Sequence, residues 1–185
     1  MKYFGLRGRV ILMVVGVLIL SMLAATLMIR SLIYQNIVEQ KKIAAELLTA
    51  SVVHDIKYDI ERRSLASSAD IIISKYMTYY RMIDKIMVYD KDAILLVASD
   101  KKNIEERTFD TYINMAITSA KPSIITSEED KNQLGIRSIS PVLQGSKIIG
   151  AVVLDISIND IQQTLAAINQ RIAIIMFITV LLAIS

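Results

Sequence analysis

Two charged residues inside otherwise apolar segments are the strongest candidates for chemistry in this chain of 185 residues. Arg137 stands in the segment IRSISPVL, and Asp155 stands near the end of KIIGAVVLDI. A guanidinium group offers a planar fork of donors that suits bidentate capture of a carboxylate. That carboxylate could belong to a bound ligand, or it could be Asp155 in an internal ion pair. The sequence leaves both readings open.

Two tyrosines complete the candidate set. Tyr89 comes just before an Asp-Lys-Asp turn, and Tyr112 lies in a short predicted helix. Each could line a ligand pocket, although a tyrosine on an apolar face is more often part of the core. The candidate ligand-binding residues are therefore Arg137, Asp155, Tyr112 and Tyr89.

The composition excludes most catalytic chemistry. The chain has no Cys and a single His, His54, which rules out thiol catalysis, disulfides and Cys- or His-rich metal sites. The sequence contains no phosphate-binding loop, nucleophile elbow, kinase signature or dinucleotide fingerprint. The acidic run Glu128-Glu129-Asp130 lacks the spacing of a calcium loop and indicates a solvated turn. We therefore expect no catalytic residue, cofactor or metal ion in this segment.

The charge distribution argues against a nucleic-acid partner. Lys2, Arg7 and Arg9 are the only charges before Arg30. All 18 acidic residues and an equal number of Lys and Arg lie from Arg30 to Arg171. The formal net charge of +3 thus belongs to the first nine residues. A nucleic-acid-binding domain needs a basic face, and the neutral body of this chain does not supply one by number.

An uncharged run of 20 residues, Val10–Ile29, predicts a first transmembrane helix. At 1.5 Å per residue it would span about 30 Å, the thickness of the hydrocarbon core of a bilayer. The run is longer than the apolar region of a signal peptide and ends in bulky residues, so we expect a retained anchor. The basic residues before it place the N-terminus in the cytoplasm and the body outside.

A second apolar run, Ile172–Ser185, has 14 residues, fewer than the roughly 20 needed for a crossing. We expect it to be a truncated second transmembrane helix, with the intact protein continuing into the cytoplasm. Ser157 and Asp160 have capping-box spacing, and neither Pro nor Gly interrupts the chain from Asp160 to its end. The pattern predicts a helix that starts near Asn159 and runs into the membrane.

Between the two membrane segments the periodicity predicts an α+β domain on a five-stranded antiparallel sheet. Arg30–Asp59 has helical spacing and should continue the first membrane helix. A second helical stripe with alternating steps of four and three could pack on its own domain or form a dimer seam: Leu65, Ala69, Ile72, Tyr76, Tyr79 and Ile83. A short helix is expected at Phe109–Ser119, and strands are expected at Lys85–Tyr89, Ala93–Ser99, Ile124–Thr126, Leu134–Ser140 and Lys147–Ile156. The last strand is almost wholly apolar, which is typical of a central strand.

The order of these elements, with the segments IMVYDKDAILLVAS and IRSISPVLQGSKIIGAVVLDIS, resembles the Cache family of PAS-like extracytoplasmic sensor domains in bacterial receptors. The resemblance implies a small-molecule ligand, and it places Arg137 where related citrate and dicarboxylate sensors carry a carboxylate-binding Arg. Those sensors have Arg and His where this chain has Leu95 and Ala98, and a further basic residue at the position of Ile139. These departures argue against citrate or a dicarboxylate. Amino-acid-binding members have an Asp near Asp155 that meets the ligand amine, so Arg137 with Asp155 could suit an amino acid.

The domain layout expected from these observations is 1–9 cytoplasmic tail, 10–29 transmembrane helix, 30–83 helical stalk and dimerisation helices, 84–158 sensor core, 159–171 signalling helix, and 172–185 second transmembrane helix. We expect an extracytoplasmic sensory module of a homodimeric receptor in the bacterial inner membrane, most simply a two-component sensor histidine kinase. A chemoreceptor or diguanylate cyclase input domain is the first alternative. A non-signalling, membrane-anchored protein-binding domain is the second.

Overall fold

The computed structural model describes residues 6–60, 64–100, 106–129, 133–158, 170–175 and 177–178. Residues 170–175 and 177–178 are helical. The remainder of the expected signalling helix and second membrane segment, including the Asp160 half of the capping box, lies outside the described residues. The chain divides into two compact units, and the unit Glu39–Asn159 contains the sheet and the helices packed on it.

The first element is one uninterrupted helix, α1 (Leu6–Asp59). It confirms that the membrane-length apolar run and the predicted stalk are continuous. In the described part of the chain, α1 is the one helix long and apolar enough to cross a membrane, with a mean hydropathy of 2.2 over its most apolar window. Within the folded unit, its fully buried residues Ala45, Thr49, Val52 and Ile56 follow steps of four, three and four, so one face of the helix belongs to the core.

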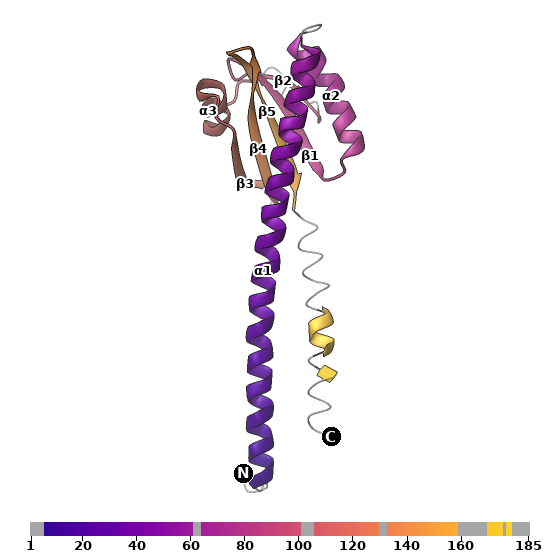
Figure 1. Ribbon diagram of the computed structural model, residues 1–185, viewed down its shortest axis with the longest axis vertical. Helices are drawn as coiled ribbons and strands as arrows, with labels where there is room; N and C mark the ends of the chain where they lie inside the picture. Colours follow the sequence, from indigo (N-terminus) through magenta and orange to yellow (C-terminus); the bar gives the residue numbers. More distant parts are fainter. Residues whose placement is uncertain are drawn as a thin grey trace. The chain divides into compact units, whose positions relative to one another are not determined.

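The second helix, α2 (Leu65–Tyr79), lies beside the distal part of α1 (Figure 1). Ser64 caps its N-terminus by accepting a hydrogen bond from the amide of Ser67. Ala69, Ile72 and Tyr76 of the predicted stripe are buried, so these turns pack within the domain. The stripe was expected to reach Ile83, and this is wrong: the helix ends at Tyr79, and Ile83 opens the first strand, where it pairs with Ile156.

The sheet has five antiparallel strands in the order β2-β1-β5-β4-β3, which confirms the predicted fold class and the central place of the last strand. The strands and the short helix that crosses the sheet are β1 (Ile83–Asp90), β2 (Leu95–Ala98), α3 (Thr111–Ser119), β3 (Ser123–Glu129), β4 (Gln133–Gln144) and β5 (Lys147–Ser157). Glu128 and Glu129, expected in a turn, are the last residues of β3. The local composition of the acidic run could not show how far the pairing of β3 with β4 extends toward their turn.

The two central strands approach each other closely at Gly150. A Cβ atom at this position would overlap the backbone oxygen of Tyr89 and would lie 3.1 Å from Leu65 of α2. Glycine is therefore required for the β1–β5 pairing and for the seating of α2 on that face of the sheet. The turn between β1 and β2 is also locally determined, because the carboxylate of Asp90 accepts hydrogen bonds from the amides of Asp92 and Ile94.

The helices lie on opposite faces of the sheet. α1 and α2 cover the face of Val152, Leu154 and Ile156, while α3 packs on the face of Ala151 and Val153. At the end of β5, the ammonium group of Lys41 on α1 donates a hydrogen bond of 2.8 Å to the carbonyl oxygen of Ser157. The strand that leads toward the C-terminus is therefore bonded directly to the helix that leads from the N-terminus.

Candidate ligand site

A row of charged side chains crosses the face of the sheet that α3 covers. Lys85 on β1, Asp155 on β5 and Arg137 on β4 are direct partners in the strand register, so their side chains leave the same face. Arg137 binds Asp155 through two parallel hydrogen bonds: Nε lies 2.7 Å from Oδ1 and Nη2 lies 2.8 Å from Oδ2. The Asp155 side chain is 3% exposed and that of Arg137 is 20% exposed. The internal ion pair is thus a structural fact.

A third group joins this pair from the helix above it. Asp110 caps the N-terminus of α3, where its Oδ1 accepts hydrogen bonds from the amides of Tyr112 and Ile113. Its Oδ2 lies 3.7 Å from Nη1 of Arg137. Arg137 therefore connects β5, through Asp155, to the beginning of α3, through Asp110. Any anion that competed for this guanidinium would act on both elements.

Beyond the charged row, the space between α3 and the sheet is filled by apolar side chains. Their buried members are Met87, Tyr89, Leu95, Ala98, Ile113, Ala116, Ile139, Ala151 and Val153. The hydroxyl of Tyr89 donates to the sulfur of Met87 at 3.5 Å. Burial raises the pKa of Tyr89, and the nearby carboxylates of Asp110 and Asp155 act in the same direction, while Arg137 lowers it. Tyr89 therefore lies within electrostatic reach of the charged row.

A small cavity of about 230 Å³ opens next to this layer. Its apolar part consists of Met87, Tyr89 and Leu95, and its polar part consists of Lys85, Glu106, Arg107 and Thr108. The segment that carries the last three is bonded to the sheet edge, since the amide of Leu95 donates to Glu106 and that of Thr108 donates to Ala93. The cavity thus joins an apolar floor to a rim with charges of both signs, and Lys85 places it beside the charged row.

The structure brings three of the four predicted site residues together. Arg137, Asp155 and Tyr89 share one face of the sheet. Tyr112 is 43% exposed on α3 and is not among the residues that line the cavity. Its position on the helix, one residue before the buried Ile113, turns it away from the apolar layer.

Sequence reasoning missed Lys85, Asp110 and the segment Glu106–Thr108. Lys85 had a usable signal, because it alternates with Met87 and Tyr89 along a predicted strand and so shares their face. Asp110 also had one, since an Asp at the start of a predicted helix is a typical cap. The segment Glu106–Thr108 had none, because its pairing with residues 93–95 is set by the tertiary fold.

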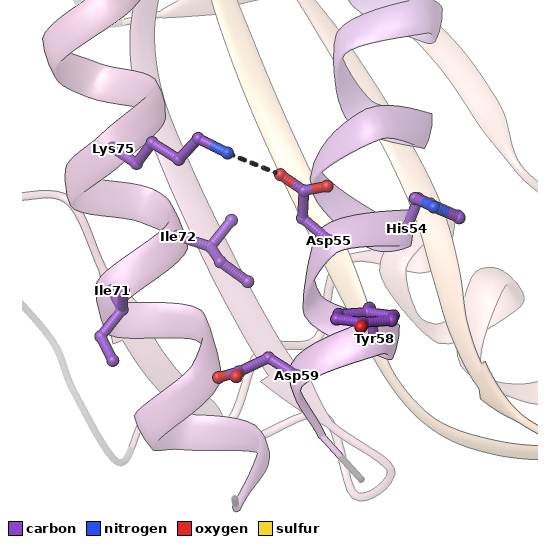
Figure 2. A pocket seen from close by; sticks show the side chains of 7 residues that line it. All are labelled: His54, Asp55, Tyr58, Asp59, Ile71, Ile72 and Lys75. Atoms are coloured by element: carbon purple, nitrogen blue, oxygen red, sulfur yellow. Dashed lines mark hydrogen bonds and ion pairs between the residues drawn. The ribbon is translucent and has the colours of Figure 1, made fainter. Parts of the chain in front are cut away.

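A larger and more open groove of about 460 Å³ lies between the distal end of α1 and α2. Figure 2 shows Lys75 of α2 reaching across it to Asp55 of α1. Ile71 and Ile72, one turn earlier on α2, also line the groove. The two atoms of that ion pair are 3.1 Å apart, and the hydroxyl of Tyr76 also donates to Asp55. This network fastens α2 to α1, so we assign it to the packing of the helix pair.

Comparison with solved structures identifies the fold. The V. cholerae histidine kinase DctB sensor domain matches with a TM-score of 0.58 and 14% identity over 78% of this chain and 58% of that one. The ligand-binding domain of the Campylobacter jejuni chemoreceptor Tlp3, in complex with 4-methylisoleucine, matches with a TM-score of 0.58 and 16% identity over 77% and 63%. The same domain in complex with L-valine matches with a TM-score of 0.55 and 16% identity over 79% and 65%.

The chain has the fold of these sensor domains, as the Cache resemblance implied. It spans about three fifths of the length of the structures it matches. No family model matches the sequence, and no curated protein is similar enough to count as a relative.

Proposed function

We propose that this chain is the extracytoplasmic ligand-sensing and transmembrane signalling module of a bacterial receptor. The observation that carries the proposal is the charged row Lys85–Asp155–Arg137, which lies beside an apolar-floored cavity on one face of a sensor fold. The fold is joined to a membrane-length helix without a break. Together these features couple a site for a small molecule to an element that can cross the membrane.

The lining of the cavity favours a small amino acid or a related carboxylate. Lys85, whose ammonium group lies 2.9 Å from the carboxylate of Asp100, and Arg107 offer cations to a ligand carboxylate, and Glu106 offers an anion to an ammonium group. Met87 and Leu95 would contact a short aliphatic side chain. A volume of about 230 Å³ is below the roughly 300–1,000 Å³ typical of drug-sized ligands, which limits the ligand to a few heavy atoms. The Tlp3 domain, which shares the fold, is described in complex with L-valine.

Arg137 and Asp155 would act as the switch of this site. A ligand shifts a two-state equilibrium only as far as its affinity differs between the two states. In the present arrangement Arg137 is bonded to Asp155 and lies near Asp110. A ligand carboxylate that drew the guanidinium toward the cavity would weaken these contacts, and both β5 and the start of α3 would respond.

The output that we propose is a histidine kinase, supported by the shared fold of the DctB sensor domain. In this arrangement the first nine residues are cytoplasmic, the folded unit lies outside the bacterial inner membrane, and a movement of β5 is carried inward. A test is amino-acid-dependent incorporation of phosphate from ATP in membranes that contain the receptor. If no amino acid changed the incorporation of phosphate, but amino acids changed the methylation of the receptor, the output would be that of a chemoreceptor and not of a kinase.

We also propose that the receptor is a homodimer that pairs through α1. On the helix face opposite the buried one, Ile43 is 51% exposed and Leu47 is 66% exposed. Because the chain has no Cys, a single Leu47→Cys variant reports on pairing without background. Oxidation should give a disulfide-linked dimer in membranes, while Asp70→Cys on the exposed face of α2 should remain monomeric. Equal cross-linking of both variants would contradict this interface.

The ligand proposal is tested with the full chain in neutral detergent micelles. Its unfolding midpoint is measured with each of the common amino acids, with short carboxylic acids and with amines. We expect a small aliphatic amino acid to raise the midpoint, and Lys85→Met to remove most of that increase. Asp92→Asn, on an exposed turn outside the cavity, is the matched control and should respond like the parent. A stabilising ligand whose effect survives Lys85→Met unchanged would show that it binds elsewhere.

A further inference from the structure

A second cavity lies on the opposite face of the sheet, between α1 and the strands β3 and β4. Its volume is about 320 Å³. The side of α1 contributes Glu46 and Ala50, and the sheet side contributes Pro122, Ser123, Ile124, Ser138, Ile139 and Ser140. All of these residues belong to the one compact unit Glu39–Asn159. The cavity is separate from the candidate ligand site, because Ser138 follows Arg137 on β4 and successive strand residues point to opposite faces.

One serine in the wall of this cavity is almost completely buried and has no hydrogen-bond partner in the described part of the chain. Ser138 is 3% exposed, yet its side chain makes no hydrogen bond to any residue in the described part of the chain. The neighbours of Ser138 on the same face of β4, Ile136 and Val142, are fully buried and apolar. The oxygen of Ser138 is not fully buried, so its hydroxyl is open to the cavity and is available to a group bound there.

Two further serines, Ser123 and Ser140, and one carboxylate complete the polar lining. The register pairs Ser123 with Ile139, so the hydroxyl that shares the face of Ser138 is that of Ser140. Ser140 lies two residues further along β4 on the same face, and no described residue accepts or donates a hydrogen bond to its side chain. Glu46 is the one ionisable residue among those that line the cavity, and it forms no ion pair with any described residue. Glu46 and Ala50 are both exposed, so the α1 side of the cavity is accessible from solvent.

This set of groups selects the chemistry of the occupant. A carboxylate and two hydroxyl oxygens accept hydrogen bonds, and the net charge of the lining is negative. An anionic ligand would be repelled by Glu46, and an apolar one would leave the serines without partners. A primary ammonium group has three donors and a positive charge, so it can bond to all three oxygens at once.

We propose that this cavity is a binding site for a small organic cation with a primary ammonium group. Glu46 would bind the charge, and Ser138 and Ser140 would accept its remaining hydrogen bonds. Such a ligand would bridge α1 and β4, so its binding would bear directly on the helix that continues toward the membrane. The proposal does not depend on the amino-acid site, which lies on the other face of the sheet.

The test uses the full chain in neutral detergent micelles, with putrescine and ethanolamine as probes and the neutral isostere 1,4-butanediol as the reference. Binding is measured by titration calorimetry and by the shift of the unfolding midpoint. We expect an ammonium probe to bind and 1,4-butanediol not to bind. Glu46→Gln should weaken binding about tenfold or more, because it removes a charged hydrogen bond. Ala50→Leu should abolish binding by filling the cavity.

Glu39→Gln is the matched control, because this carboxylate lies on the same helix and does not line the cavity. Its affinity should equal that of the parent. Valine and putrescine should bind without competing, which separates this site from the one on the α3 face. The proposal is overturned if neither probe binds at concentrations up to about 10 mM. It is equally overturned if Glu46→Gln and Ala50→Leu, shown to be folded by circular dichroism, bind as tightly as the parent.

Discussion

Replacing Arg137 by methionine should destabilise the folded unit strongly. The change keeps most of the aliphatic volume of the side chain but removes both hydrogen bonds to Asp155, at 2.7 and 2.8 Å. The Asp155 carboxylate, 3% exposed, would then be buried without its main partner. Breaking a buried ion pair in this way costs about 3–5 kcal/mol. We expect the lower half of this range, because the Arg137 side chain is 20% exposed and the pair is therefore partly open to water.

The double variant Arg137→Met with Asp155→Leu gives the decisive comparison. Replacing both members of a buried pair by apolar residues is often neutral or stabilising. The double variant should therefore be within about 1–2 kcal/mol of the parent and clearly more stable than the single one. The chain has no Trp and eight Tyr, so urea unfolding of the full chain in micelles can be followed by near-ultraviolet circular dichroism of the tyrosines. If Arg137→Met cost less than about 1 kcal/mol, the pair would contribute little and the reasoning from its burial would fail.

Three further predictions concern the sheet, the start of β1 and the start of α3. Gly150→Ala should prevent close pairing of β1 with β5, because the added Cβ would overlap the backbone oxygen of Tyr89, and faster amide exchange along both strands would show it. Burial and the nearby Asp155 raise the pKa of Asp84, so ionisation of this carboxyl opposes folding. The stability of Asp84→Asn relative to the parent should therefore increase as the pH rises from about 4 toward neutrality. Asp110→Ala should cost about 1 kcal/mol by removing the cap of α3, with faster exchange of the amides in its first turn.

Each of these has a matched control. Gly145 has a positive φ of 63° but open space around it, so Gly145→Ala should cost about 1 kcal/mol without disturbing the pairing of β1 with β5. Asp70→Asn, on the exposed face of α2, should give no stability difference that depends on pH in this way. Ser64→Ala removes the cap of α2 and should leave exchange in α3 unchanged. If a variant and its control gave the same change in stability or amide exchange, the local contact would not be the cause.

Most of the fold could be predicted because its signals are local. The apolar length of α1, the Asp-Lys-Asp turn after Tyr89 and the continuous apolar run of β5 each depend on residues close in sequence. The boundary at Ile83 could not be predicted in this way. Its spacing from Tyr79 fits a helix, and its place in β1 comes from pairing with Ile156, which is far away in the chain.

Only part of the candidate site could be predicted from the sequence. Arg137 and Asp155 were recognisable as charges in apolar strands, yet whether they bond to each other depends on the register of β4 and β5, which the sequence does not reveal. Register also decides that Lys85 stands opposite Asp155. The expectation for Tyr112 depended on which side of a short helix faces the sheet, and in the structure Ile113 and Ala116 of α3 pack there.

The bond between Lys41 and the carbonyl of Ser157 has a mechanical consequence. It ties α1 and β5 together at the end of the strand, so a force pulling on the last residue of β5 is shared with α1 before it reaches the rest of the sheet. A displacement of the end of β5 therefore reaches α1 directly for as long as this bond holds.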